Sequence, residues 1–301
     1  GHAPQPVHVH PAGVAVHPHL RAADAHLPED RAVGVRAFAV RRADFATPDV
    51  PFRRWNYQAG LGAEALGDPR WRPNLEQAAR VLEALERNEF TFLNHTHRFE
   101  GAIGWNDPGL AQLWRYNLHY FHYLEALQTL RAASPGNAPY EQFKRLVSAW
   151  MDGNERLLGD GWHPYTMSLR LVNWINAATT FAAELGRDPE FRSRFLGSVR
   201  AQAANLHGNL ELDVRGNHLL ENIRALLWAG ASFDAPEARR WKGTAMRLLR
   251  WELDAQVGAD GGHFERCPGY HVLVLRDFIE IARWLGLVDG AAPAWLLDRV
   301  R

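Results

Sequence analysis

The sequence has little cysteine, little lysine and no long apolar run. Its 301 residues include one cysteine, Cys267, which excludes a disulfide framework and a cysteine-based zinc site. No apolar run approaches the roughly 20 residues that span a bilayer, and no signal peptide is visible. The 34 basic and 34 acidic side chains cancel. This balance argues against bulk binding to nucleic acid or to a membrane surface, although it leaves local charged patches open.

Apolar residues, arginine and tryptophan are abundant. Apolar residues make up 47% of the chain, enough for a substantial core, and charged residues make up 23%, a share typical of globular proteins. All but two of the 34 basic residues are arginine. The planar guanidinium suits carboxylate and sulfate groups, although a GC-rich genome would give the same bias. The 12 tryptophans suit a hydrophobic core and also the stacking of sugar rings.

The first 58 residues differ from the rest, and we expect a flexible lead-in there with a short strand segment. Apolar residues between Val33 and Phe45 alternate loosely, which predicts one or two short strands. Histidines are scattered among prolines without helical spacing, so a flexible segment competes with opportunistic metal binding. These histidines are His2, His8, His10, His17, His19 and His26. We predict no resident metal and no cofactor.

From residue 59 to residue 301 the pattern is largely helical. Apolar residues recur at the spacing of an amphipathic helix, and turns rich in glycine and proline separate the segments. Several segments are apolar on more than one face, as in the run from Leu169 to Ile175, which suits an inner ring packed inside an outer one. The sequence predicts an all-α fold, an α/α toroid of antiparallel helix pairs, and not a four-helix bundle. The expected helices cover residues 74–90, 110–130, 140–158, 168–185, 191–210, 218–233, 236–257 and 270–285.

One polar cluster, Arg215 to His218, directly precedes an apolar helical segment. We predict that Asn217 caps this helix and that Gly216 provides the turn before it. Free backbone N–H groups at such a helix start, beside an amide and an imidazole, favour an anion. Plain capping with a solvated His218 is the alternative.

A second cluster occupies the glycine-rich loop of residues 260–271. Tyr270 follows a Pro-Gly pair, so we place it at the start of a helix and not inside a core. Positive charge from Arg266, His263 and His271 would favour the phenolate and make the Tyr270 proton easier to remove. A structural tyrosine that caps a backbone group is the alternative.

Two further clusters combine aromatic rings with hydrogen-bonding side chains, as a sugar-binding cleft requires. The first covers residues 162–174, where Arg170, Asn173 and Trp174 share one helix face. The second covers residues 114–121 and includes His119. An aromatic core, with Arg170 satisfied by a carboxylate, is the alternative reading.

At these four clusters the sequence resembles the N-terminal domain of the heparinase II/III family of polysaccharide lyases. The matching stretches are residues 114–121, residues 162–174, GNHLLENIRALLWAG from Gly216 and DGGHFERCPGYHVLVLRD from Asp260, within about residues 105–287. The resemblance implies an incomplete toroid that cleaves a uronic-acid-containing polysaccharide, heparin-like or alginate-like, by β-elimination. It also implies a periplasmic or secreted location.

The resemblance assigns roles by position and residue type. Asn217 and His218 would neutralise the uronate carboxylate, and Tyr270 would serve as general acid and, on some substrates, as base. Substrate contacts would come from His119, Trp162, Arg170, Asn173, His263 and Arg266. Family members continue into a β-sandwich that supplies a further catalytic histidine. We expect this chain to lack that domain, because no alternating strand run follows Tyr270. The expected partners are thus an acidic polysaccharide and a separate β-sandwich domain.

Two other functions stay open. The chain could be a non-catalytic module that binds an acidic polysaccharide and is derived from such a lyase. It could also be an inverting glycoside hydrolase, which needs two carboxylates about 6.5–9.5 Å apart. The candidates for that pair are Asp260, Glu265 and Glu221.

Overall fold

The computed structural model of the protein describes residues 74–134, 136–155 and 157–300. The expected lead-in and the strands predicted between Val33 and Phe45 lie outside these residues, and so does the expected boundary near residue 58. Within the described residues, no helix is both long enough and apolar enough to cross a bilayer.

Helices make up most of the described chain, and one short hairpin lies near its start. The elements in chain order are α1 (Leu75–Glu86), β1 (Glu89–Phe92), β2 (His95–Arg98), α2 (Gln112–Tyr120), α3 (Leu124–Ala133), α4 (Ala138–Gly153), a 3₁₀ turn (Asp160–Trp162), α5 (Pro164–Thr180), α6 (Ala182–Arg187), α7 (Pro189–Gly208), α8 (Gly216–Ser232), α9 (Pro236–Gln256), α10 (Pro268–Asp289) and α11 (Ala294–Val300). A proline stands in the first turn of α4, α5, α7, α9 and α10, where a missing N–H group costs no helical hydrogen bond.

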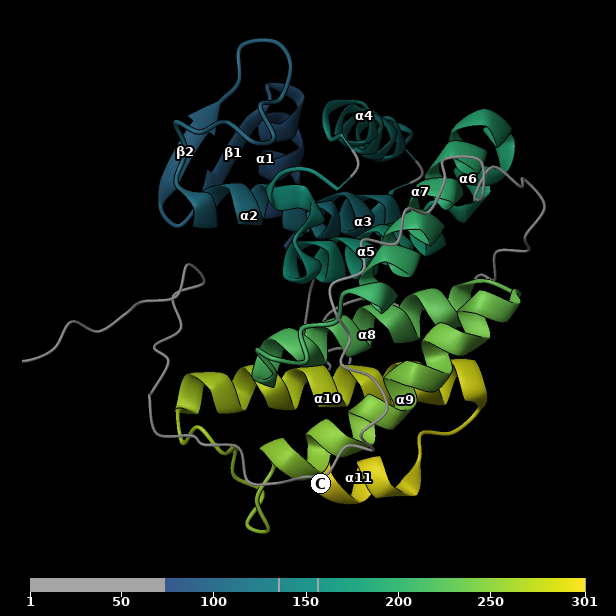
Figure 1. Cartoon of the computed structure of the whole chain (residues 1–301). Helices are drawn as coiled ribbons and strands as arrows, with labels where there is room; N and C mark the ends of the chain where they lie inside the picture. The colour runs from purple at the N-terminus through teal and green to yellow at the C-terminus, as the bar shows by residue number, and fades with distance from the viewer. Residues whose placement is uncertain (1–73, 135, 156, 301) are drawn as a thin grey trace, which may run out of the picture.

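The helices form two layers that the chain visits in alternation. In the inner layer α3 contacts α5, α5 contacts α8, and α8 contacts α10, so that α8 lies between α5 and α10 (Figure 1). In the outer layer α4 contacts α7, α7 contacts α9, and α9 contacts α11. Each inner helix also contacts the outer helix that follows it in this order. The predicted all-α, incomplete α/α toroid is thereby confirmed.

Two of the inner helices, α5 and α8, are buried on every side. All residues of α5 from Thr166 to Ala178 are buried, and so are all residues of α8 from His218 to Ser232. A helix that is apolar all round belongs in a core, so the apolar run from Leu169 to Ile175 was a correct indication of an inner layer. Tryptophan supplies much of the packing, because Trp174 and Trp228 are fully buried.

The helix predicted over residues 110–130 is in fact two helices. Phe121 ends α2 in the left-handed conformation, with a φ of 62°. Its ring is fully buried, stacked 5.5 Å from Trp105 and edge-on at 5.3 Å to Trp174. Tertiary packing of this ring holds a backbone conformation that a non-glycine residue rarely adopts.

The helix predicted over residues 74–90 ends early, because a hairpin begins within it. Residues 89–92 pair antiparallel with residues 95–98, and Phe92 lies opposite His95. Leu93 and Asn94 both have positive φ, which is the backbone of a tight two-residue hairpin turn. Phe90 is 3% exposed and fastens the hairpin to the core.

Candidate active site

The first turns of α5, α8 and α10 meet at one end of the inner layer. Tyr165, the second residue of α5, stacks on His218, the third residue of α8. On the other side, Oε1 of Glu265 lies 3.8 Å from the position that a side chain at Gly216 would occupy. Glu265 stands just before α10, so the starts of all three helices lie together.

The start of α8 differs by one residue from the prediction. The helix begins at Gly216, and Arg215 holds the cap position without a side-chain cap hydrogen bond. Asn217 is therefore the second helical residue, and the prediction that it caps the helix is wrong. The shift arises because Arg215 and Gly216 both take positive φ, of 60° and 58°. The side chain of Asn217 is thus free of the capping role, while the first N–H groups of α8 still lack helical acceptors.

Tyr165 contacts both members of the Asn217–His218 pair. Its ring centroid lies 4.3 Å from that of His218, with an angle of 32° between the ring planes. Its hydroxyl group hydrogen-bonds with the amide of Asn217. Burial, followed by the charge of Glu221, raises the pKa of Tyr165 well above its usual range, so this phenol keeps its proton at neutral pH.

His218 is held from its other side by a buried carboxylate. Its Nδ1 lies 2.8 Å from Oε1 of Glu211, and the two side chains are only 5% and 8% exposed. Because a carboxylate only accepts hydrogen bonds, the ring donates from Nδ1. The other oxygen of Glu211 accepts from Nδ2 of Asn222 at 2.9 Å, and that amide also contacts Oγ of Ser168 at 3.0 Å. This chain of contacts fixes the orientation of the imidazole.

Tyr270 is the third residue of α10 and is half-buried at the rim of the site. Burial, followed by the negative charge of Glu265 and Cys267, raises its pKa above the ordinary value. The expectation that nearby cationic groups would ease its deprotonation is therefore wrong, because burial, and after it the carboxylate of Glu265, shifts the pKa upward. Tyr270 is a neutral phenol at neutral pH and is suited to give a proton rather than to take one.

Two of the predicted substrate contacts lie beneath the site. Arg170 is fully buried, and its guanidinium donates to the carbonyl of Gly161 at 2.7 Å and to Oε1 of Gln202 at 2.8 Å. His119 is also fully buried and accepts from Nε1 of Trp150 at 3.0 Å. Burial and then the charge of Arg170 lower the pKa of His119, so its ring is neutral. The structure gives both side chains a packing role, and carbonyl and amide oxygens satisfy Arg170 in place of the carboxylate considered above.

The other predicted contacts differ in exposure. Asn173 is 5% exposed and donates to the carbonyl of Tyr120 at 2.8 Å. His263 is 5% exposed and lies 3.1 Å from Oε1 of Gln256. Trp162 is half-buried and Arg266 is exposed, so these two side chains are the ones with surface to offer a polysaccharide.

Aromatic rings extend the site along α2. Tyr120 packs edge-on against Tyr165 with centroids 5.9 Å apart, and Tyr116 lies 5.3 Å from the ring of His163. Burial, and then the charge of Asp160, raises the pKa of Tyr116 to about 12. These tyrosines supply faces and hydroxyl groups of the kind that sugar rings bind.

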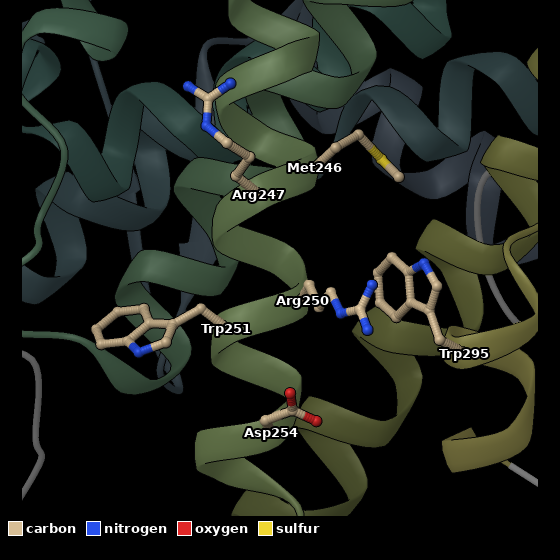
Figure 2. Close-up of a pocket in the computed structure, with 6 residues that line it drawn as sticks. All are labelled: Met246, Arg247, Arg250, Trp251, Asp254 and Trp295. Atoms are coloured by element: carbon tan, nitrogen blue, oxygen red, sulfur yellow. The ribbon is translucent and has the colours of Figure 1, made fainter. Parts of the chain in front are cut away.

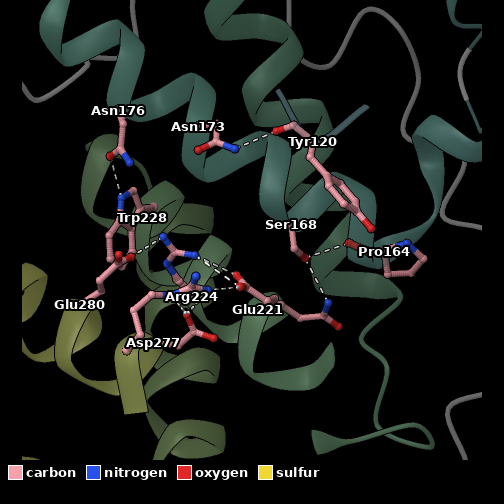
Figure 3. Close-up of polar contacts among 12 residues, drawn as sticks. Tyr120, Pro164, Ser168, Asn173, Asn176, Glu221, Arg224, Trp228, Asp277 and Glu280 are labelled. Atoms are coloured by element: carbon pink, nitrogen blue, oxygen red, sulfur yellow. Dashed lines mark hydrogen bonds and ion pairs between the residues drawn. The ribbon is translucent and has the colours of Figure 1, made fainter. Parts of the chain in front are cut away.

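A buried ion network lies below the site, between α8 and α10. Glu221 contacts Arg224 at 3.1 Å, and Arg224 also pairs with Glu280 (Figure 3). Asp277 pairs with Arg276 at 2.9 Å. Burial raises the pKa of both Glu221 and Asp277. Because Glu221 is 1% exposed and engaged with Arg224, the structure does not favour it as a carboxylate of a glycoside hydrolase.

Asp260 is likewise engaged, because its Oδ1 accepts from the backbone N–H of Gly262 at 2.9 Å within its own turn. In the part of the chain that the structure describes, no three side chains of the metal-ligating types converge on a point.

Sequence reasoning missed the roles of Tyr165 and Glu211. The sequence did contain a signal for Tyr165, because this residue directly follows a proline at a helix start. Tyr270 stands in a similar position, two residues after Pro268. Glu211 had no such signal, because it lies in the irregular segment before α8 and meets His218 only through the turn at Arg215.

A separate groove of about 540 Å³ lies away from these residues, on the outer side of the fold. It is lined by Met246, Arg247, Arg250, Trp251, Asp254 and Trp295 of α9 and α11 (Figure 2). None of the predicted site residues lines it.

Comparison with known proteins identifies the relatives of this chain. Residues 73–292 match the family described as Heparinase II/III N-terminus. The chain is 28% identical over 227 residues to a heparin-sulfate lyase of Pedobacter heparinus, and this alignment covers 69% of this chain and 34% of that protein. It is 31% identical over 135 residues to a heparin-sulfate lyase of Bacteroides stercoris, and this alignment covers 42% of this chain and 20% of that protein.

Solved structures share the fold. The crystal structure of heparan sulfate lyase HepC from Pedobacter heparinus matches with a TM-score of 0.66 at 23% identity, over 76% of this chain and 37% of that one. A structure of heparinase III matches with a TM-score of 0.65 at 20% identity and the same coverage. The alignments with the two curated relatives span between 20% and 34% of those proteins.

Proposed function

The chain belongs to the heparinase II/III family, because residues 73–292 match the family's N-terminal region, and we propose that it is the toroid part of a polysaccharide lyase. Its substrate is a uronic-acid-containing polysaccharide, of the heparin or heparan sulfate kind or of the alginate kind, and the reaction is β-elimination. The names of the similar heparin-sulfate lyases support this class of reaction.

The start of α8 carries the proposal. A lyase removes the C5 proton, which is acidic because it lies next to the uronate carboxylate, and negative charge then builds on that carboxylate. Asn217 and the free N–H groups of the first turn of α8 are donors for this charge, and the helix dipole favours it. His218 lies beside these donors and is held by Glu211 and Tyr165. We call Asn217, His218 and the first N–H groups of α8 the carboxylate-binding end.

Tyr270 supplies the proton in this mechanism. Its raised pKa keeps the phenol protonated at neutral pH, so it can protonate the glycosidic oxygen as the C4–O4 bond breaks. Glu265, which lies beside Gly216 and raises the pKa of Tyr270, joins the two halves of the site. The base in this proposal is a further histidine on a β-sandwich domain, which the family resemblance implies.

The test is an ultraviolet assay for the unsaturated uronate product with heparan sulfate, alginate and hyaluronan. The chain is assayed alone and within its full-length reading frame. We expect product from at least one polymer, and loss of product in Asn217→Ala and Tyr270→Phe. Tyr140→Phe, on the remote helix α4, is the matched control. Absence of product from the full-length protein on all three polymers would refute the proposal.

Binding without cleavage is the second candidate function. The observation that favours it is the groove on α9, which combines tryptophan and arginine and contains none of the proposed catalytic residues. Retardation of the chain by a polysaccharide gel, unchanged in Asn217→Ala and Tyr270→Phe and without product, would support it.

A further inference from the structure

We propose that the outer face of α9 is a second binding site for an anionic polysaccharide, separate from the first turns of α5, α8 and α10. The site centres on the groove of Met246, Arg247, Arg250, Trp251, Asp254 and Trp295. The choice of polymer rests on the proposed function, but the site does not depend on catalysis.

Unpaired positive charge marks this face. Arg240, Arg247 and Arg250 are exposed and fall within one face of α9, about 15 Å long from end to end at the helical rise. Among the described residues none of the three forms an ion pair with a carboxylate, although the charge of Arg240 acts on Glu237, whereas Arg239 pairs with Asp234 at 3.3 Å. For a protein with a formal net charge of zero, a local arginine surface is what would attract an acidic polymer.

The acid in the groove does not cancel this charge. Asp254 lies 3.9 Å from Nη2 of Arg299, which supplies a cation of its own. Arg250 and Arg247 therefore remain the groups that face a ligand. A guanidinium presents a planar fork that matches a carboxylate or a sulfate, which a compact ammonium does not.

Two tryptophans line the groove on either side of α9, and the guanidinium of Arg215 covers one face of Trp251. Trp251 and Trp295 are half-buried, and the guanidinium of Arg250 lies 5.8 Å from the ring of Trp295 (Figure 2). Aromatic faces pack against the C–H faces of sugar rings, and neighbouring arginines bind the anionic substituents. Met246 is the one apolar side chain of the lining that carries no aromatic ring, so the groove favours a charged saccharide over an apolar protein segment.

Arg215 connects the groove with the start of α8. Its guanidinium lies 3.9 Å from the ring of Trp251, and its Nε lies 3.3 Å from Oε1 of Glu252. The same residue precedes Gly216 and Asn217, so one side chain, paired with Glu252, links the α9 face to the proposed catalytic end. A long polysaccharide could occupy both sites, and tethering at α9 would then raise its effective concentration at α8.

The test measures affinity for heparan sulfate and for hyaluronan by gel retardation and calorimetry of the full chain. Arg247→Gln with Arg250→Gln should weaken binding about five- to tenfold, the effect of losing two exposed ion pairs. Arg80→Gln with Arg98→Gln, which removes the same charge from exposed positions on α1 and β2, is the matched control and should bind like the wild type.

The outcomes separate this site from the lyase proposal. Asn217→Ala should lose any cleavage and keep its retardation. Binding without cleavage by the wild type would leave the α9 site standing while the lyase proposal fails. Equal affinity of the α9 double variant and its control would overturn the site. So would a change of oligomeric state in the α9 variant without a change of affinity, because the groove would then be a self-contact.

Discussion

The ring of Tyr165 lies 4.3 Å from the ring of His218, and the Tyr165 hydroxyl hydrogen-bonds with Asn217. One side chain of α5 thus contacts two consecutive residues of α8. The stack fixes the plane of the imidazole, and the hydrogen bond fixes the amide. Positioning of the carboxylate-binding end therefore depends on α5 as well as on α8.

Tyr165→Phe should separate these two contacts. The variant keeps the stack on His218 and loses the hydrogen bond to Asn217, so we expect kcat to fall about two- to tenfold with little change in KM. Tyr165→Ala should lose more, because the stack disappears as well. Steady-state kinetics in the ultraviolet assay measure both. Tyr140→Phe on the remote helix α4 is the control, and wild-type kinetics for Tyr165→Phe would show that the hydroxyl has no positioning role.

Glu211→Ala should destabilise the fold. The substitution leaves buried donors of His218 and Asn222 without their acceptor, so the free energy of unfolding should drop by about 1 to 3 kcal/mol or more. Denaturant unfolding followed by circular dichroism measures the change. Glu190→Ala in the first turn of α7 is the exposed control, and equal stability of the two variants would contradict the prediction.

The fall of kcat/KM at alkaline pH should reflect the ionisation of the Tyr270 phenol. Its raised pKa in the folded protein predicts that kcat/KM persists up to and beyond the ordinary tyrosine value of about 10. Glu265→Gln removes a charge that raises this pKa, so the fall should move to lower pH. Asp260→Asn in the same loop should leave it in place. A fall that stays at the same pH in Glu265→Gln would exclude Tyr270 as the titrating acid.

Stability should fall with rising pH because of the buried carboxyl groups below the site. Burial raises the pKa of Glu221 to about 7, above that of the unfolded chain. The folded state therefore binds the extra proton, and this stabilisation is present below about pH 4.5 and is lost as the pH rises towards 7. Glu221→Gln should gain stability relative to the wild type over this interval. Glu76→Gln, exposed on α1, is the control, and parallel pH curves for wild type and Glu221→Gln would refute the prediction.

The inner layer could be predicted from the sequence because burial on all sides leaves a direct trace. The apolar run from Leu169 to Ile175 required a buried helix, and the structure places it in α5. The break at Phe121 left no such trace. It depends on the rings of Trp105 and Trp174, which come from other segments of the chain.

The polar clusters showed where the site lies but not how its groups are arranged. Asn217 and Tyr270 stand at helix starts, as predicted, because prolines and glycines mark those boundaries. The sign of the shift at Tyr270 could not be predicted, since Glu265 and Arg266 are neighbours in the sequence and only the fold decides which one acts on the phenol. Burial of Arg170 could not be predicted either, because the carbonyl of Gly161 that receives it is invisible in a residue pattern.

The two positive φ angles at Arg215 and Gly216 have a consequence for the rotational phase of α8. Each residue of an α-helix advances the side-chain direction by about 100°. Adding or deleting one residue in this turn while the body of α8 stays packed would turn the position of Asn217 by about that angle, away from Tyr165. The length of the turn before α8 is therefore as strict a requirement as the identity of the residues in it.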